Sequence, residues 1–253
     1  MNNPRHQRIL SLLSAEVECK SATLMHELGV SEATLRRDLS ELVERGKVVR
    51  THGGALLRPE ALHEASFIEK TLSAPEGKRA IAACALDLIS SNTSVYIDSG
   101  TTCLELARRL LRRNDCHIFT NSIPIVVEAC NYNANVTVIG GSLRAVSRAL
   151  IGSTPLNWLE NLHFDYSIIG ASAIDTYRGA FTTETHEASI KQQAMRASEN
   201  AILLCDHSKW EKRAPVRFAQ WSDFDHCIID EDLEAATART LGKQLHLHLA
   251  QKL

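Results

Sequence analysis

The sequence predicts an α/β protein in two parts, a winged helix-turn-helix at the N-terminus and a larger α/β domain with a mostly parallel sheet after it. Three observations lead to this prediction. The first 57 residues show helical periodicity followed by a short basic β stretch. Residues 58–76 lose that pattern and contain prolines. From residue 77 onward, short β-rich runs alternate with amphipathic helices. We therefore expect one domain at 1–57, a linker with short helix at 58–76, and a second domain at 77–253.

The composition is that of an ordinary globular protein. The chain has 253 residues, of which 44% are hydrophobic and 23% charged, enough for two modest cores. No apolar run approaches the roughly 20 residues of a membrane helix, and the N-terminus lacks the apolar core of a signal peptide, so we expect a cytoplasmic protein. The seven cysteines are scattered and form no C-x-x-C pair. They are expected to be reduced thiols rather than disulfides or zinc ligands.

Two short helices are expected before the turn at Gly29-Val30. Pro4 suits the first turn of the first helix, whose apolar residues, such as Ile9 and Leu13, would face the core. Ser21 is expected to cap a second helix over residues 22–28. Both helices would act as a scaffold for the segment that follows them.

The next segment carries one apolar stripe at helical spacing, which predicts an amphipathic helix. Its stripe consists of Leu35, Leu39, Leu42 and Val43. Ser31 is placed to cap the N-terminus of this helix, and Gly46 to end it. Residues 47–51 then form a short β stretch, which Gly53-Gly54 would turn into a hairpin.

A helix with a polar face and a basic hairpin suits DNA, because the helix can enter the major groove while the hairpin reaches phosphates. Thr34, Arg36 and Glu32 are expected to read bases, and the remaining polar residues to hold the backbone. The alternative is a surface helix whose arginines are merely solvated. Residues 1–58 contain nine Lys and Arg and seven Asp and Glu, so the excess of positive charge is small. Two or more such domains would therefore have to bind DNA together. The candidate DNA-binding residues are Ser31, Glu32, Thr34, Arg36, Arg37, Lys47, Arg50 and His52.

The second domain is predicted to hold a parallel sheet covered on both faces, since its strands are almost continuously apolar and separated by helices. Helices are expected at 77–89, 102–113, 123–133, 154–162, 186–199 and 232–242, and strands at 95–97, 117–120, 136–139, 166–169, 201–205 and 226–229.

Polar or glycine-rich turns follow these strands, and ligands of such sheets bind beyond the carboxyl ends of the strands. Gly100-Thr101-Thr102 is the sharpest turn, because backbone amides at the start of a helix can hold a phosphate. The alternative is that its threonines only cap the helix. Arg144, Lys191 and Lys209 would add positive charge, although Lys191 could equally be solvated.

Three carboxylates are candidates to accept hydrogen bonds from sugar hydroxyls, namely Asp98, Glu184 and Asp206, although Asp206 could simply cap its turn. The complete set of candidate effector-binding residues is Asp98, Gly100, Thr101, Thr102, Asn121, Gly140, Gly141, Arg144, Gly170, Ala171, Glu184, Lys191, Asp206 and Lys209.

With these residues in place, the chain resembles the DeoR/GlpR family of bacterial repressors over almost its whole length. The C-terminal succession D-x-G-T/S-T, T-N, G-G-x-x-R, a glycine-rich turn, a helical lysine and D-x-S-K occurs in the family order. The N-terminal match comprises Ser31, Thr34, Arg36, Arg37, Asp38, Leu39, Leu42, Gly46, Arg50, His52, Gly53, Gly54 and Ala55.

The resemblance implies a transcriptional repressor of a carbohydrate catabolism operon that is released or modulated by a phosphorylated sugar or sugar alcohol. Operator DNA, that effector and further copies of the chain, as a dimer or tetramer, would be its partners, and no membrane. The C-terminal domain of the family resembles ribose-5-phosphate isomerase and related isomerases in fold. Ala173 and Lys70 stand where the family commonly has glycine and arginine, which leaves the identity of the sugar open.

An alternative function is a sugar-phosphate isomerase with an appended DNA-binding domain, in which Asp98, Glu184 or Asp206 would carry a proton. We expect a regulator rather than an enzyme, without a cofactor. We also expect no metal: His246 and His248 share one face of a possible final strand, yet no cysteine or carboxylate accompanies them in the sequence.

Overall fold

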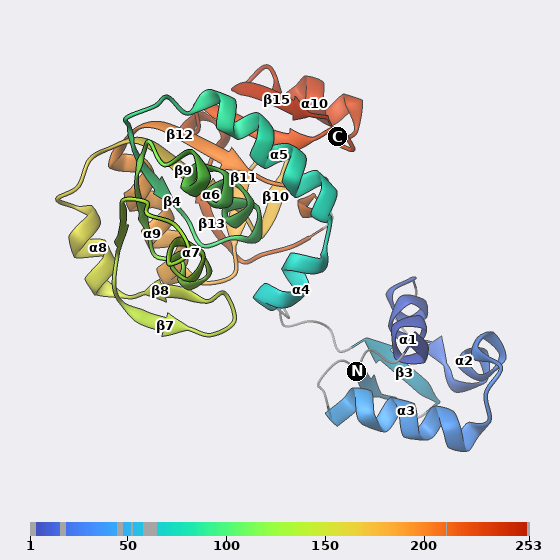
Figure 1. Cartoon of the computed structure of the whole chain (residues 1–253). Coiled ribbons are helices and arrows are strands. Elements are labelled where there is room, and N and C mark those ends of the chain that lie inside the picture. Colours follow the sequence, from blue (N-terminus) through green and yellow to red (C-terminus); the bar gives the residue numbers. More distant parts are fainter. Residues whose placement is uncertain are drawn as a thin grey trace. The chain divides into compact units, whose positions relative to one another are not determined.

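The chain divides into two compact units, Met1–His63 and Glu64–Leu253 (Figure 1). The structure is a computed structural model that describes residues 4–15, 19–44, 48–51, 53–57, 65–210 and 212–251. Within these residues, no helix has both the length and the apolar character needed to cross a membrane.

The first unit is a three-helix scaffold with a small antiparallel sheet in the order β1-β3-β2. Strands β2 and β3 form the expected wing, and β1 pairs with the other edge of β3. Gly46, Lys47 and His52 lie outside the described residues. The elements are α1 (Pro4–Ala15), β1 (Cys19–Lys20), α2 (Ser21–Leu28), α3 (Glu32–Glu44), β2 (Val48–Arg50) and β3 (Gly54–Leu57).

A compact apolar core holds this unit together, with Ile9, Leu24 and Leu35 fully or almost fully buried. Gly54 is required by the β1-β3 pairing, because a Cβ at this position would lie 2.1 Å from the carbonyl oxygen of Cys19. One detail of the expected stripe was wrong: Val43 is 39% exposed. The core face of α3 passes instead through Asp38, which is buried in an ion pair described below.

The second unit is built on a sheet of seven strands, all parallel, in the order β15-β14-β12-β9-β4-β5-β6. From β4 the chain first winds outward through β5 and β6, and then crosses to β9 and winds the other way. The sheet therefore has its topological switch point between β4 and β9. Its strands are β4 (Ser94–Ile97), β5 (His117–Thr120), β6 (Val136–Val138), β9 (Phe164–Gly170), β12 (Ser198–Leu204), β14 (His226–Asp230) and β15 (His246–Ala250).

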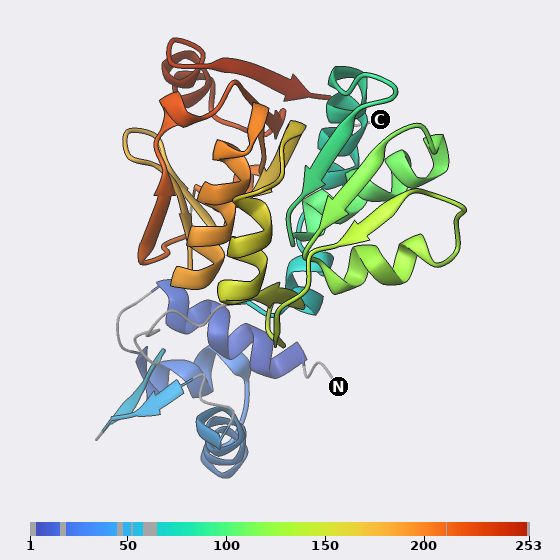
Figure 2. The same cartoon turned by 90° about the vertical axis from the view of Figure 1, so that its left-hand side faces the viewer.

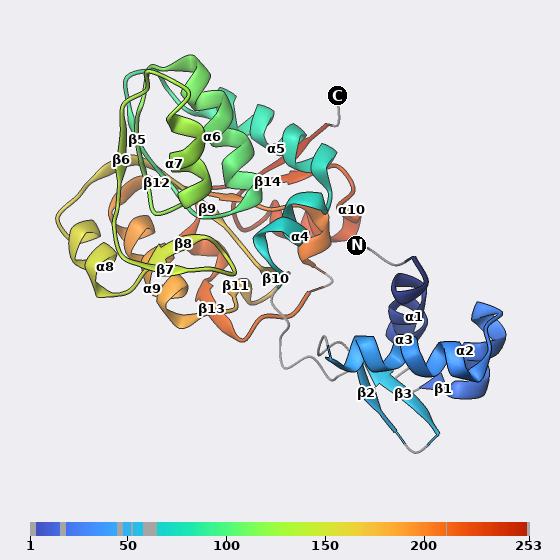
Figure 3. The same ribbon diagram turned by 60° about the horizontal axis from the view of Figure 1, so that its bottom comes forward.

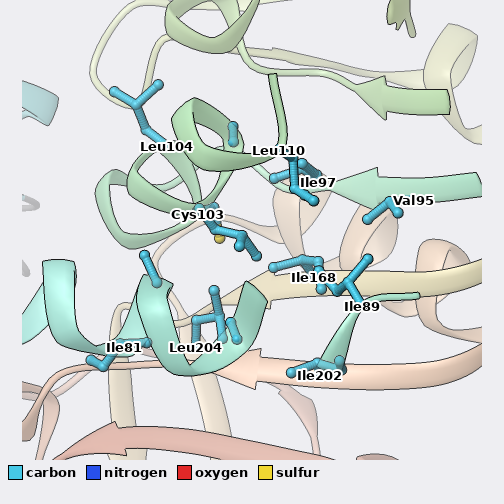
Figure 4. Packing of buried hydrophobic residues seen from close by; sticks show 14 of the residues in the cluster. Ile81, Ile89, Val95, Ile97, Cys103, Leu104, Leu110, Ile168, Ile202 and Leu204 are labelled. Carbon is cyan, nitrogen blue, oxygen red and sulfur yellow. The ribbon is translucent and has the colours of Figure 1, made fainter. Parts of the chain in front are cut away.

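Helices cover both faces of this sheet (Figure 2). On one face, Ile81 of α5 and Leu104 and Leu110 of α6 pack against strand residues such as Ile97 and Ile168 (Figure 4). Residues of α8, α9 and α10 form the core on the other face. The helices are α4 (Phe67–Leu72), α5 (Pro75–Leu88), α6 (Thr101–Arg113), α7 (Ile123–Ala129), α8 (Ser153–Leu159), α9 (Thr185–Arg196) and α10 (Ala235–Leu241), with short 3-10 helices η1 (His207–Lys209) and η2 (Trp221–Asp223).

Five short strands lie outside the main sheet and were not expected from the sequence. They are only three or four residues long, which is too short for periodicity to reveal. One pair forms a hairpin, and the other three form a second antiparallel sheet. They are β7 (Ser142–Arg144), β8 (Ala149–Ile151), β10 (Ala173–Asp175), β11 (Gly179–Thr182) and β13 (Val216–Ala219).

The stretch expected as a linker contributes to the second unit. Helix α4 lies within it and begins with a capping box, in which Ser66 and Glu69 exchange hydrogen bonds. Phe67 is buried in the core on the α5-α6 side, and Pro75 already starts α5. The packing of the second unit thus begins before residue 77.

Candidate functional site

The N-terminus of α3 presents polar side chains from a capped first turn. The Ser31 hydroxyl accepts a hydrogen bond from the Thr34 amide at 3.4 Å and lies 3.0 Å from the Thr34 hydroxyl. Glu32, Arg36 and Arg37 are exposed. A side-chain cap leaves the helix tip ordered and its polar face open.

The wing lies against the same helix. Arg50 Nη2 donates to the main-chain oxygen of Arg36 at 2.9 Å, so this wing side chain is fixed along α3. A groove runs between α2, α3 and the wing, with Glu32 and Thr51 among its lining residues. Of the candidate DNA-binding residues, Glu32, Arg36 and Arg50 border this groove.

An ion pair with a buried carboxylate fixes α1 to α3. Asp38, 2% exposed, accepts hydrogen bonds from Arg5 Nη2 at 2.9 Å and from His6 Nε2 at 3.2 Å. Arg5 holds the pKa of Asp38 below its ordinary value, because its hydrogen bonds favour the ionised carboxylate. Arg37 and Asp38 are neighbours in the sequence, yet one faces solvent and the other the core.

The second unit has a cavity at the switch point between β4 and β9. Seven of the candidate effector-binding residues line it: Gly100, Thr101, Thr102, Gly170, Ala171, Lys191 and Lys209. Nine further lining residues were not anticipated: Phe67, Lys70, Ser99, Cys103, Ser147, Ser172, Thr182, Glu187 and Leu204.

The turn predicted to bind an anion opens α6, a helix of 13 residues, directly at this cavity. Gly100 is the N-cap and offers no side chain to the amides of the first turn, while Thr101 and Thr102 lie inside the helix and are buried. The threonines are thus not at the cap position, contrary to the alternative interpretation. Uncapped amides at a helix N-terminus favour a negatively charged partner.

Lys191 crosses the pocket from α9 to the end of β4. Its Nζ donates to Asp98 Oδ2 and, at 3.1 Å, to the carbonyl oxygen of Gly170. Burial alone would lower the pKa of Lys191, but Asp98 and Glu187 raise it above its ordinary value. Asp98 also accepts the Gly170 amide at 3.0 Å. With 4% exposure, Lys191 is not the solvated lysine that the alternative proposed.

Glu187 is the main polar residue that sequence reasoning missed. Its carboxylate accepts from Arg144 Nη1 at 3.2 Å and from the Thr182 hydroxyl at 3.1 Å, and Arg144 also donates to Ser147 at 3.2 Å. It lies three residues after Glu184, which had been preferred. A carboxylate with two such donors retains further lone pairs for a ligand hydroxyl.

The D-x-S-K turn, residues 206–209, contributes Lys209 to the lining of the cavity. Asp206 is fully buried, and its Oδ2 lies 3.7 Å from Lys209 Nζ without a hydrogen bond. Burial would raise the pKa of Asp206, but Lys209 and Lys78 keep it below its ordinary value. Burial lowers the pKa of Lys209, and that of Lys78 to about 8. Buried cations that are only partly compensated attract an anion.

Seven of the fourteen candidate residues are not among the lining residues of the cavity. Three of them, Asp98, Arg144 and Asp206, are described above, and the other four follow here. Asn121 connects the Tyr96 hydroxyl, at 3.1 Å, to the Leu150 carbonyl, at 3.0 Å. Glu184 caps α9 by accepting the Glu187 amide at 2.9 Å. The remaining two are Gly140 and Gly141, the second of which allows a close approach of Ile151, whose oxygen would lie 2.6 Å from a Cβ.

One cluster in the described part of the chain has the composition of a metal site, His207 with Asp230 and Asp232. Asp230 accepts both the main-chain amide of His207 at 2.8 Å and its Nδ1 at 2.7 Å, so the pair already satisfies itself. His226 of β14 lies beside the two histidines of β15, and its Nδ1 is 3.1 Å from His248 Nε2. This distance is that of an ordinary hydrogen bond between two imidazole rings and does not require a metal.

A winged helix-turn-helix followed by an α/β domain with a cation-lined crevice defines a DNA-binding regulator that carries its own sensor domain. Residues 5–60 match the DeoR-like helix-turn-helix domain, and residues 73–231 match the DeoR C terminal sensor domain. The chain belongs to the DeoR family of transcriptional regulators.

Named relatives agree with this assignment over most of the chain. The HTH-type transcriptional regulator GlpR of Haloferax volcanii is 34% identical over 231 residues, 91% of each chain. The glycerol-3-phosphate regulon repressor of Haemophilus influenzae is 31% identical over 223 residues, 88% of this chain and 87% of the relative. These relatives are regulators and not enzymes, so the prediction of a DNA-binding transcriptional regulator is confirmed.

A solved structure of ribose 5-phosphate isomerase A from Methanocaldococcus jannaschii is also similar, with 16% identity, 53% of each chain covered and a TM-score of 0.36. A likeness of this extent carries no argument about activity. The expected α/β class with its parallel sheet is confirmed by the strands themselves.

Proposed function

We propose that the chain represses a carbohydrate catabolism operon. A phosphorylated sugar or sugar alcohol, bound at the switch point of the sheet, would modulate its affinity for operator DNA. The observation that carries this proposal is the cavity in which the uncapped start of α6 faces buried lysines. The similarity to the glycerol-3-phosphate regulon repressor of Haemophilus influenzae supports a ligand of this class.

In this proposal the phosphate lies on the amides and hydroxyls of Thr101 and Thr102, with Lys209 as a further donor. Glu187 accepts a hydrogen bond from a sugar hydroxyl. The other candidate residues hold these groups in position, as Asp98 holds Lys191. Anions bound at a helix start gain from both the free amides and the helix dipole.

For DNA binding, we propose that Thr34, Arg36 and Glu32 contact base edges in the major groove. Ser31, Arg37 and Arg50 would contact phosphates, together with Lys47 and His52 outside the described residues. Residues 1–57 would bind DNA, and residues 58–76 would connect the two domains while α4 also lines the effector pocket. Residues 77–253 would bind effector and associate with further copies of the chain. Because one such domain has little excess positive charge, a homodimer or tetramer would bind a repeated operator.

Coupling between the two sites requires a ligand that prefers one of two conformations. Allosteric linkage of this kind is typically worth about 1–3 kcal/mol, which is roughly a 5- to 150-fold change in DNA affinity. We expect a change within that range.

The test is fluorescence anisotropy with labelled DNA from the regions flanking the protein's own gene. Glycerol 3-phosphate, fructose 1-phosphate and hexosamine phosphates are added in turn, each with its unphosphorylated form as the control. We expect sequence-specific binding that one phosphorylated compound changes and its unphosphorylated form does not. Binding that ignores sequence, or that no phosphorylated compound alters, would contradict the proposal.

A further inference from the structure

Helix α4 forms one wall of the cavity, although it lies in the stretch that connects the two domains. Phe67 and Lys70 both line the cavity. The Phe67 amide donates to Val146 at 2.9 Å, and Arg148 lies over the Phe67 ring at 5.4 Å, so the start of α4 is attached to the β7-β8 hairpin. Figure 3 shows α4 between the start of α5 and the rest of the second unit.

The end of α4 is held by Lys78, a buried lysine of α5. Lys78, 2% exposed, donates from Nζ to the main-chain oxygens of Lys70 and Ser73. The Thr101 hydroxyl, at the anion-binding turn, donates to the same Lys70 oxygen at 3.5 Å. One carbonyl of α4 is therefore shared by Lys78 and by the turn that would bind phosphate.

The corner between α4 and α5 is strained. Ala74 has φ 45° and ψ 50°, the left-handed conformation that side chains other than glycine rarely adopt. Such a conformation persists only where surrounding contacts impose it. Both hydrogen bonds from the Lys78 side chain reach across this corner, from α5 to main-chain oxygens before Ala74. The Lys78 amide itself donates to the Ala74 oxygen at 3.1 Å.

We propose that Lys78 is a positioning residue that fixes α4 as a wall of the effector pocket, so that ligand binding and the order of α4 are coupled. This rests on the proposed function. When an anion binds at the turn, its charge draws the Thr101 hydroxyl away from Lys70, since a charged acceptor forms the stronger hydrogen bond. Lys78 keeps the Lys70 carbonyl in place during that exchange, and the anion then attracts the Lys70 ammonium.

The consequence is that an occupied pocket stabilises α4, the first described helix after the DNA-binding unit. Because linkage is reciprocal, whatever orders α4 also favours the ligand. A merely structural lysine would contribute to stability without altering how α4 responds to an anion.

The experiment uses the full-length chain with Lys78→Met, which keeps an unbranched side chain one atom shorter and removes its donors. Arg79→Met is the matched control, because it removes a charge from the next position of α5. Arg79 is exposed, and its main-chain oxygen, which the substitution retains, accepts a hydrogen bond from Arg109. Hydrogen exchange is followed by mass spectrometry in peptides over residues 67–74. Inorganic phosphate and glycerol 3-phosphate are the probes, with binding measured separately by calorimetry.

Without a probe, we expect residues 67–74 to exchange about tenfold faster or more in Lys78→Met than in wild type or Arg79→Met, because hydrogen bonds to a charged donor are lost. With a probe, exchange over these residues should slow in wild type and Arg79→Met and remain unchanged in Lys78→Met. The probe should still bind to that variant, with lower affinity.

Equal exchange in the two variants without a probe would overturn the proposal. So would a probe that binds wild type by calorimetry without slowing α4, and in that case the proposed function would stand. If neither probe nor any other sugar phosphate binds wild type, the proposed function fails by itself, and with it the coupling. If Lys78→Met loses protection throughout the second unit, Lys78→Gln, which retains one donor group, is measured instead. The same general loss there would show that Lys78 serves the fold alone.

Discussion

The pair of Lys191 and Asp98 allows the most direct test of how the pocket is built. Both side chains are almost fully buried, and Asp98 Oδ2 receives the Lys191 ammonium and the Gly170 amide. Lys191→Met would leave a buried carboxylate with one hydrogen bond. Breaking a buried pair in this way costs about 3–5 kcal/mol.

The double variant Asp98→Asn/Lys191→Met should be much less destabilised, because the asparagine oxygen can still accept the Gly170 amide and no charge remains buried. We expect a loss of roughly 1–2 kcal/mol, similar to that of an apolar replacement of a buried pair with imperfect packing. The double variant should therefore be more stable than the single variant by about 1–4 kcal/mol, whereas additive effects would make it less stable.

Urea denaturation followed by tryptophan fluorescence is the assay. All three tryptophans, Trp158, Trp210 and Trp221, belong to the second unit, so the signal reports its unfolding. With a urea dependence of about 2 kcal/mol per molar, Lys191→Met should lower the midpoint by roughly 1.5–2.5 M. Because the pKa of Lys191 is raised above 10.5, the pair's stabilisation is present below that pH and lost only above it. The loss should thus be the same at pH 6 and pH 9.

A loss below about 1 kcal/mol for Lys191→Met, with additive effects in the double variant, would refute this reasoning. Lys191 would then contribute little to the fold, and its place would have to be explained by ligand binding.

Three further predictions concern the rest of the chain. Thr101→Val should raise the effector concentration that gives a half-maximal change in DNA binding by roughly tenfold, because one donor to the phosphate is lost. If that concentration is unchanged, Thr101 does not belong to the proposed site. Burial lowers the pKa of Lys78 from 10.5 to about 8, so between these values the unfolded chain binds more protons, and wild type should gain stability over Lys78→Met as pH rises from 8 to 10.5. The gain is up to roughly 1.4 kcal/mol per pH unit, and urea denaturation at pH 8 and pH 10.5 would measure it. A difference in unfolding free energy between the two proteins that does not change with pH would contradict this prediction. Arg37→Ala should weaken binding to all DNA sequences about equally and reduce the salt dependence by about one ion, whereas Arg36→Ala should lower the preference for the operator, as titrations at several salt concentrations would reveal; identical behaviour of the two variants would contradict the assigned roles.

Much of the fold was available from the sequence, because the signals are local. The stripe of α3, the Ser31 cap and the six apolar strands of the main sheet follow from periodicity and turn chemistry within a few residues. The start of α6 at Thr101 was likewise expected within one residue. The family resemblance, confirmed over most of the chain, added the class of protein.

The composition of the candidate pocket, in contrast, depends on strand order. Periodicity identifies strands but does not say that β9 pairs with β4, and this pairing alone places Gly170 beside Asp98. Glu187 could not be distinguished from Glu184 by spacing, since both lie near the start of α9. Only the packing of that helix turns Glu187 into the pocket and leaves Glu184 as its cap.

What the sequence by itself determined is therefore most of the helices, the strands of the main sheet and the winged helix-turn-helix, because these depend on neighbours along the chain. It also singled out the turn at Gly100 as a candidate anion site. What only the tertiary structure decided is which distant groups meet. Phe67 and Lys70 became a wall of the cavity, and Lys78 came to hold α4, through contacts between elements that no local pattern records. The physical reason is that long-range pairing and burial are properties of the whole folded chain, and they select partners only once the sheet has formed.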